Sequence, residues 1–248
     1  MKQIWFNEDE GELGGVRFKV GHSNYDQLKT TADLIWVLKG KKFFDRYDTY
    51  FGKFEPRTVL EIGVFEGGSA LLLADKWPNA KIVGVDIREP NENVFKHAER
   101  LGVRDRISLH YKTSQDDVGM MRRIIENEFP DGLDLVIDDA SHLYPHTATS
   151  FDAVFPFLNP GGTFVVEDWA WAHWADYQDI PYWNDKQALT NLLFEVCMSC
   201  GTKGYLISDV YVNSSFFAVK KAANCPTLSD SFKLRTTYIL RAKELNRI

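Results

Sequence analysis

Cysteine is scarce in this sequence, and long hydrophobic runs are absent. Three cysteines in 248 residues are too few for a disulfide framework. Cys197 and Cys200 have the spacing of a metal or redox motif, but no second C-x-x-C pair accompanies them, so we interpret them as packing residues of an apolar helix. No run approaches the roughly 18 apolar residues that cross a membrane, and residues 1–15 are too acidic for a signal peptide. We therefore expect a soluble, cytoplasmic protein without a membrane partner.

An excess of basic residues is also missing. The chain has 29 lysines and arginines against 35 aspartates and glutamates, which gives a formal net charge of −6 and a pI near 5.6. Binding to a nucleic-acid backbone depends on a basic surface that displaces counterions. The charge balance therefore argues against nucleic acid as the main partner and favours a small-molecule substrate.

Strand-like and helix-like segments alternate through most of the chain. Residues 25–50 carry apolar and aromatic side chains at helical spacing, which predicts a helical appendage over residues 1–50 and a main domain over 51–248. Strands are expected at 58–62, 81–86, 106–111, 133–138 and 162–167, helices at 67–76, 92–101, 116–128, 145–157 and 187–200, and a closing hairpin at 205–210 and 215–219. This alternation predicts an α/β fold: a doubly wound, mostly parallel, seven-stranded Rossmann-like sheet with an antiparallel last strand.

A glycine-rich turn follows the first strand of this alternation. Residues 61–68 have the pattern E-x-G-x-x-x-G-G, and Phe65 stands where a dinucleotide-binding turn has its second glycine. A pyrophosphate fits such a turn poorly, which disfavours a nicotinamide dehydrogenase. The negative charge of Glu61 suits a cationic ligand with an amino-acid portion, such as S-adenosylmethionine. Asp86 ends the next strand, where a carboxylate can accept hydrogen bonds from a ribose.

Acidic residues follow two other neighbouring strands. Asp138, Asp139 and His142 come after the strand at 133–138, and Glu167 and Asp168 end the strand at 162–167. The carboxyl ends of parallel strands meet at one edge of the sheet, so these side chains are expected to share a crevice. Each alone could cap a helix or remain a solvated charge. As a set they favour a site for magnesium, calcium or manganese, because clustered carboxylates need a cation.

Four blocks of this sequence resemble class I S-adenosylmethionine-dependent methyltransferases. The resemblance is closest to the metal-dependent O-methyltransferases that modify sugars in antibiotic biosynthesis, and it extends to their cephalosporin hydroxylase-like relatives. It covers roughly residues 43–170 and is carried by VLEIGVFEGGSALLLAD, KIVGVDI, LDLVIDDASHLYPHTATSF and LNPGGTFVVEDW.

The resemblance implies roles for individual residues. It places Mg²⁺ on Asp139, Glu167 and Asp168, and it makes His142 the general base, with Asp139 also in the catalytic set. It implies that S-adenosyl-L-methionine is bound by residues of the glycine turn and of the following strand ends: Glu61, Gly63, Val64, Phe65, Gly67, Ser69, Asp86, Ile87, Ser114, Gln115 and Asp138.

The reaction implied is methyl transfer to a hydroxyl of a sugar or a glycosylated natural product. Magnesium would make the hydroxyl more acidic, and a neighbouring imidazole would take its proton. A metal-dependent enzyme of other chemistry on the same fold, hydroxylase-like or a hydrolase, is the alternative, and a binding protein without turnover is a third possibility. The aromatic residues of segment 169–183 either enclose the acceptor or form an oligomer contact, and we expect a homo-oligomer.

Overall fold

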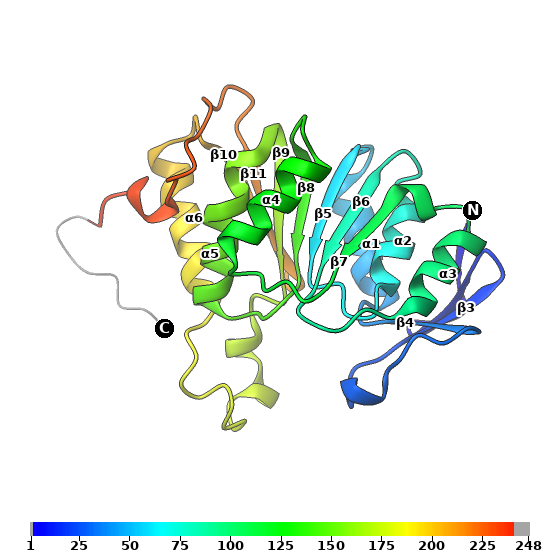
Figure 1. Ribbon diagram of the computed structural model, residues 1–248. Helices are drawn as coiled ribbons and strands as arrows, with labels where there is room; N and C mark the ends of the chain where they lie inside the picture. Colours follow the sequence, from blue (N-terminus) through cyan, green and yellow to red (C-terminus); the bar gives the residue numbers. More distant parts are fainter. Residues whose placement is uncertain (1, 241–248) are drawn as a thin grey trace. The chain divides into compact units, whose positions relative to one another are not determined.

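The computed structural model describes residues 2–240 of the chain, which fall into two compact units divided after Thr113 (Figure 1). The first unit contains a small N-terminal sheet, the glycine turn and the strands on either side of it. The second unit contains the strands that end in acidic residues and the closing hairpin. The boundary predicted at residues 50 and 51 stays a prediction.

The N-terminal residues form a four-stranded sheet, where the sequence pattern predicted helix from residue 25 onward. The strands are Gln3–Trp5 (β1), Glu10–Leu13 (β2), Val16–Val20 (β3) and Leu34–Val37 (β4), in the order β1-β2-β3-β4, with only β3 and β4 parallel. The helix α1 begins only at Lys41 and ends at Phe51. Residues 25–27 form one short 3-10 helix, but the predicted helix was wrong over residues 34–37, because Ile35 and Val37 are buried as alternate residues of a strand.

The rest of the first unit confirms the predicted alternation to within one residue at each end. It consists of Thr58–Ile62 (β5), Gly68–Lys76 (α2), Lys81–Val85 (β6), Glu92–Arg100 (α3) and Ile107–His110 (β7). The three strands are parallel, with Thr58 beside Lys81 and Ile82 beside Ile107. Nearly every residue of β5 and β6 is buried, which explains their almost continuous apolar sequence.

The second unit carries the strands that position the acidic residues. Its elements are Val118–Glu128 (α4), Leu133–Asp138 (β8), Tyr144–Val154 (α5), Leu158–Glu167 (β9), Thr190–Thr202 (α6), Ile207–Val212 (β10) and Phe216–Lys221 (β11). β8 and β9 are parallel neighbours, and β11 lies antiparallel between β9 and β10. β9 begins four residues earlier than predicted, because an irregularity in its pairing with β8 accommodates the Pro160-Gly161 turn within the strand.

The larger sheet has seven strands in the order β10-β11-β9-β8-β5-β6-β7, and β11 is antiparallel to both of its neighbours. This order confirms the predicted doubly wound, Rossmann-like α/β fold with an antiparallel last strand. The hairpin turn is held by Asn213, whose side-chain oxygen accepts hydrogen bonds from the backbone N–H groups of Ser215 at 2.7 Å and Phe216 at 3.0 Å.

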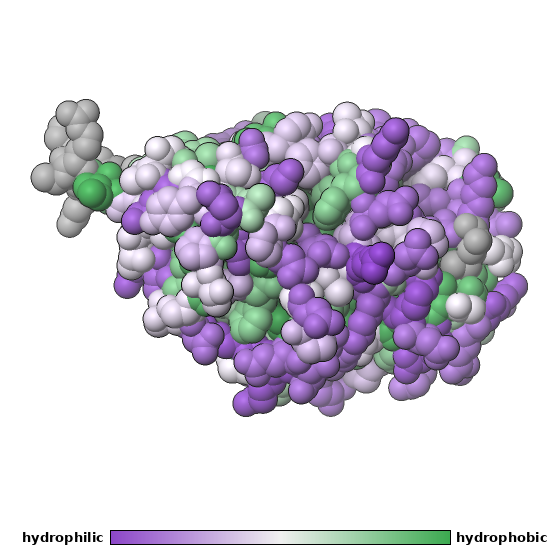
Figure 2. All heavy atoms as spheres, turned by 90° about the horizontal axis from the view of Figure 1, so that it is seen from above, coloured by the Kyte–Doolittle hydropathy of each residue, from purple (hydrophilic) through white to green (hydrophobic). Residues whose placement is uncertain are grey.

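The surface of the molecule is largely polar on the face drawn in Figure 2, where hydrophobic side chains form only small separate patches. Among residues 2–240, no helix is both long and apolar enough to cross a membrane. The predicted cytoplasmic location stays a prediction. The packing role predicted for Cys197 was wrong: its side chain is exposed, because α6 turns Val196 and Ser199 inward instead.

Gly68 is predicted to be essential for the packing of α2. A β-carbon at this position would lie 2.1 Å from the backbone oxygen of Trp36, which belongs to β4 and cannot move like a flexible side chain. We expect Gly68→Ala to lower the free energy of unfolding by about 1–3 kcal/mol in urea denaturation, because the helix and the strand must separate.

The matched control for this prediction is Gly201→Ala. Gly201 is an exposed residue of α6, and a β-carbon there meets no atom within 4 Å. This variant should be neutral or more stable by up to about 1 kcal/mol, since alanine favours a helix over glycine. Equal stability of the two variants would contradict the close approach of β4 and α2.

Candidate functional site

The glycine turn between β5 and α2 has an unusual backbone. Gly63, Phe65 and Gly67 have φ angles of 89°, 51° and 78°, all in the left-handed region. Glycine adopts this region at little cost, but a residue with a bulky side chain needs specific contacts to stay there. Phe65 has such contacts: the Arg88 guanidinium lies 4.4 Å from its ring centroid, and its ring packs edge-on against that of Tyr25.

Asp86 follows β6 and holds the glycine turn in place. Its carboxylate accepts hydrogen bonds from the backbone N–H of Phe65 at 2.6 Å and from that of Arg88 at 2.9 Å. Burial raises the pKa of the Asp86 carboxyl above its ordinary value, and these two backbone donors oppose the rise. Each carboxylate oxygen keeps a further lone pair for a ligand hydroxyl. Ile87, the next residue, is 71% exposed and offers an apolar surface beside that carboxylate.

Glu61 forms a buried ion pair that the sequence did not reveal. The Lys39 ammonium donates a hydrogen bond to Glu61 Oε1 at 3.1 Å, and the two side chains are 4% and 0% exposed. The negative charge of Glu61 is therefore compensated within the protein, which weakens the argument that this carboxylate attracts a cationic ligand. The only sequence signal for Lys39 was its position directly after the apolar residues 34–38.

Val64 and Ser69 are buried residues of the same turn and of the start of α2. The Val64 side chain packs at Gly84, where a β-carbon would collide with it, so only the backbone of Val64 is available to a ligand. Gly67 precedes the first helical residue and, as a glycine, has no side chain to cap α2. The turn thus offers a ligand mainly backbone groups, together with Asp86 and Ile87.

The remaining cofactor residues predicted from the resemblance belong to the second unit. Gln115 Nε2 donates to both carboxylate oxygens of Asp138 at 3.3 Å, and the Ser150 hydroxyl donates to one of them. Burial raises the pKa of the Asp138 carboxyl to about 6. Ser114 donates to Asp116 in the segment before α4. Asp138 and Gln115 therefore organise the end of β8, and their contact with a cofactor stays a prediction.

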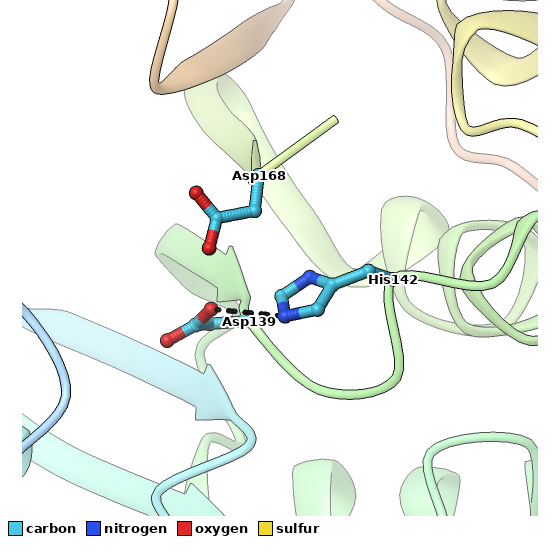
Figure 3. A group of neighbouring side chains, drawn as sticks. All are labelled: Asp139, His142 and Asp168. Carbon is cyan, nitrogen blue, oxygen red and sulfur yellow. Dashed lines mark ion pairs between the residues drawn. The ribbon is translucent and has the colours of Figure 1, made fainter. Parts of the chain in front are cut away.

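Three of the predicted chemical residues lie together at the ends of β8 and β9. Asp139 directly follows β8, His142 lies in the loop before α5, and Asp168 directly follows β9 (Figure 3). His142 Nε2 is 3.8 Å from Asp139 Oδ1, and one ligand atom from each of the three residues lies within 4.8 Å of the others. All three side chains are partly buried. The parallel pairing of β8 and β9 brings them together, as expected for adjacent strand ends.

Two members of this cluster have a strained backbone. The φ angles of His142 and Asp168 are 55° and 47°, in the left-handed region that residues other than glycine rarely adopt. Hydrogen bonds hold both conformations: the Trp171 indole donates to the His142 carbonyl at 2.8 Å, and the Asp168 N–H donates to the Ser215 carbonyl at 2.8 Å. Strain of this kind costs on the order of 1 kcal/mol per residue and is concentrated at functional sites.

Glu167 has a different environment from its neighbour Asp168. It is the last residue of β9, is 1% exposed and lies opposite Phe216 of β11. Consecutive residues of a strand point to opposite faces, so Glu167 and Asp168 are not equivalent. Among residues 2–240, the cluster that could hold a metal ion consists of Asp139, His142 and Asp168. Metal ligation by Glu167 stays a prediction.

The cluster has the dimensions and the donor atoms of a divalent-ion site. An octahedral ion with bonds of about 2.1–2.4 Å separates opposite ligands by about 4.2–4.8 Å. The three ligand atoms lie within 4.8 Å of one another, so small side-chain rotations would bring them to bonding distance. Carboxylates suit magnesium and manganese, and an imidazole also suits manganese, iron or zinc. The residues present therefore fit a divalent cation.

An aromatic segment continues the chain after Asp168 and extends away from the strands of this unit (Figure 1, yellow-green). Within it, the ring of Trp183 lies 4.3 Å from that of Trp171 and 5.8 Å from that of Tyr177. Trp171 is buried, while Tyr182 is 59% exposed. His173 forms a 2.7 Å side-chain hydrogen bond with Thr190, at the start of α6. This hydrogen bond ties the segment to the start of α6, and both of its predicted roles stay predictions.

Comparison with known proteins agrees with this geometry. Residues 60–169 match a family model described as a methyltransferase domain. Mycinamicin VI 2''-O-methyltransferase of Micromonospora griseorubida is 33% identical over 144 residues, which cover 54% of this chain and 33% of that protein. The 8-demethyl-8-alpha-L-rhamnosyl tetracenomycin-C 2'-O-methyltransferase of Streptomyces olivaceus is 33% identical over 142 residues, 53% of this chain and 34% of that protein. The match thus spans about a third of the length of these relatives.

A solved structure gives the same result. The MycE methyltransferase from the mycinamycin biosynthetic pathway, in complex with Mg and SAH, superimposes with a TM-score of 0.57 at 30% sequence identity, covering 73% of this chain and 50% of that one. The range of the family match contains the glycine turn, Asp86 and the cluster of Asp139, His142 and Asp168. Residues 60–169 of this chain are therefore similar to the methyltransferase-domain family.

Proposed function

We propose that this chain is an S-adenosylmethionine-dependent O-methyltransferase that requires a divalent ion, with magnesium the first choice. The observation that carries the proposal is the cluster of Asp139, His142 and Asp168, which combines two metal-binding carboxylates and a possible base within 4.8 Å. The glycine turn and Asp86 provide the cofactor site. The names of the relatives, which are O-methyltransferases of sugar-bearing compounds, support the reaction.

In this proposal each residue has a defined task. Asp139 and Asp168 hold the ion, which makes an acceptor hydroxyl more acidic when it is bound. His142 Nε2 would take the proton of the acceptor hydroxyl, and S-adenosylmethionine, when bound, would supply the methyl group as a sulfonium electrophile and leave as S-adenosylhomocysteine. Asp139, 3.8 Å from that nitrogen, stabilises the imidazolium that forms. Alignment of oxygen, carbon and sulfur supplies much of the rate enhancement.

The acceptor class follows from the relatives, and its identity needs an assay. We propose a hydroxyl of a sugar attached to a natural product, because the names of two of the relatives contain a rhamnosyl or an olivosyl group. The assay would present the protein with methyl-labelled S-adenosylmethionine, magnesium and a panel of deoxysugar glycosides, with the corresponding aglycones as controls. Transfer to aglycones but not to glycosides would contradict the sugar assignment. The Asp139→Asn variant would give the background rate.

A metal-dependent enzyme of other chemistry, such as a hydroxylase or a hydrolase, is the second candidate. One observation favours it: His142 lies among the possible ligands, and a set of carboxylates and imidazole also suits iron, manganese or zinc. Cofactor binding separates the two candidates. The methyltransferase must bind S-adenosylmethionine or its demethylated product with micromolar affinity, whereas the alternative has no need of either. A small-molecule acceptor, the absence of nucleic-acid binding and a homo-oligomeric state remain parts of the proposal to be measured.

Asp86→Asn is expected to weaken S-adenosylmethionine binding by about 5- to 30-fold, which corresponds to about 1–2 kcal/mol. The variant loses a charged acceptor for the ribose hydroxyls and weakens the two hydrogen bonds that hold the glycine turn. Calorimetric titration with the cofactor measures the effect directly.

The control for this titration is Glu89→Gln, which removes the same charge three residues away. Glu89 is exposed and pairs with Lys112 at 2.8 Å. Its affinity for the cofactor should match that of the wild type, since surface ion pairs contribute little. Equal affinities of Asp86→Asn and Glu89→Gln would contradict the assignment of the cofactor to this turn.

A further inference from the structure

We infer that Trp171 is a positioning residue for the proposed metal and base cluster. The inference rests on the proposed function and gives Trp171 a role different from the two predicted for the aromatic segment 169–183, which were to enclose the acceptor or to form an oligomer contact. The hydrogen bonds of Trp171 go to backbone carbonyls and not to the side chains proposed to react. Trp171 acts through the backbone of His142, whose side chain is one of the three that converge on the site.

The loop that carries His142 is held from two sides. On one side, the Ser141 N–H donates to Gln115 Oε1 at 2.9 Å. On the other, the Trp171 indole N–H donates to the His142 carbonyl at 2.8 Å. Because His142 has a φ angle of 55°, its carbonyl points in a direction that ordinary backbone does not provide, and the indole is the donor that meets it there. Loss of this donor would let the loop relax and turn the imidazole away from Asp139.

Trp171 also lies on the turn that carries Asp168. Its backbone N–H makes a long, weak hydrogen bond to the Asp168 carbonyl at 3.4 Å, which closes the turn that begins at that residue. The same residue therefore contacts the two members of the cluster that have left-handed backbone, one through its side chain and one through its main chain. This arrangement sets the spacing between the imidazole and the second carboxylate.

The indole ring has little freedom to move. Trp171 is 3% exposed, and the ring of Trp183 packs against it at 4.3 Å, with Tyr177 at 6.5 Å. A buried N–H group needs its hydrogen-bond partner, so the ring and the carbonyl hold each other in place. The aromatic packing thus fixes the position of the donor, which a flexible side chain would not do.

The test compares Trp171→Phe with Trp169→Phe. Phenylalanine keeps one aromatic ring but removes the N–H donor together with part of the volume of the indole. Trp169 is a matched control, because its indole N–H also donates to a backbone carbonyl at 2.8 Å, but that carbonyl belongs to Asn213 in the hairpin turn. Both variants lose one hydrogen bond of the same kind and length, but the urea midpoint should fall further for Trp171→Phe, because Trp171 is buried and Trp169 is only half-buried.

Manganese binding to the protein without acceptor gives the decisive readout. We expect Trp171→Phe to bind Mn²⁺ about 10- to 100-fold more weakly than the wild type, and Trp169→Phe, which leaves the His142 loop untouched, to lose clearly less affinity than Trp171→Phe. Affinity for S-adenosylmethionine should be the same in all three proteins, since the glycine turn is untouched. In the turnover assay, raising the manganese concentration should restore part of the rate of Trp171→Phe.

Equal manganese affinity of Trp171→Phe and the wild type would overturn the inference and leave the proposed function standing. If the wild type itself binds no divalent ion, the metal part of the proposed function fails, and the inference fails with it. If Trp171→Phe does not fold, Trp171→Tyr replaces it. Failure of both variants to fold, with Trp169→Phe folded, would give Trp171 a purely structural role and would also overturn the inference.

Discussion

Replacing His142 with alanine is expected to lower turnover by about 10²–10⁴-fold at saturating cofactor and magnesium. The reason is that His142 Nε2 is the base proposed to take the hydroxyl proton, and Asp139 lies 3.8 Å away to stabilise the resulting charge. The rate of methyl transfer from labelled S-adenosylmethionine to a glycoside acceptor measures this loss. Cofactor affinity should stay within about twofold of the wild type, because the proposed base acts on the acceptor hydroxyl and no residue proposed to bind the cofactor is changed.

Two controls separate the imidazole from its backbone. His142 has a φ angle of 55°, which asparagine tolerates better than alanine does, so His142→Asn removes the base with less backbone strain. If His142→Asn is as slow as His142→Ala, the missing base causes the loss. His146→Ala changes a histidine one helical turn further on, which pairs with Asp116 at 3.7 Å, and it should keep nearly full turnover.

Rescue of His142→Ala by magnesium would change the role assigned to His142 and leave the rest of the proposed site as it is. If high magnesium restores near wild-type turnover to His142→Ala, the imidazole holds or orients a metal ligand and another group is the base. In that case the variant should bind the ion about 10- to 100-fold more weakly. The presence of His142 in the cluster of possible ligands makes this distinction necessary.

Asp168→Asn is expected to abolish measurable methyl transfer at physiological magnesium, as chelation of the ion should in the wild type. Asparagine keeps the shape of the side chain and tolerates the left-handed backbone at this position, where φ is 47°. The variant therefore removes the charge that the cation needs while leaving the turn intact. Turnover measured against magnesium concentration, with and without chelator, gives the loss of activity and any rescue.

Cofactor binding provides the internal control for this prediction. Asp168→Asn should bind S-adenosylmethionine as the wild type does, because the proposed ion serves the acceptor. Asp176→Asn removes an exposed acid of the same connecting segment and should leave turnover unchanged. Full activity of the wild type in excess chelator would refute the metal requirement.

The sequence alone was sufficient for the type and order of the main strands and helices from residue 58 onward, with ends that differ by up to four residues. The strands Thr58–Ile62 and Lys81–Val85 are buried on both faces of a sheet. Such strands need apolar side chains at most positions, so they can be recognised in the sequence as mostly apolar runs. The same logic located the chemical cluster. Once β8 and β9 are parallel neighbours, Asp139 and Asp168 must lie at one edge, and the structure confirms that they lie together with His142.

The N-terminal region shows where local pattern fails. Residues 25–40 have apolar side chains at spacings that fit a helix, yet Leu34–Val37 is a strand because it pairs with β3. The strand that a short apolar run pairs with lies elsewhere in the chain. The run by itself therefore does not indicate whether it forms a helix or a strand.

Tertiary structure alone decided the partners of the site residues. Lys39 reaches Glu61 across 22 positions of sequence, and Trp171 reaches His142 across 29. No periodicity or motif encodes such contacts, since they depend on how separate elements pack. The left-handed backbone conformation of His142 and Asp168 could not be predicted from the sequence either. Hydrogen bonds with residues distant in the sequence hold this conformation against the local preference of the chain. The sequence determined which groups gather at the strand ends, and the tertiary contacts decided how each of them is held.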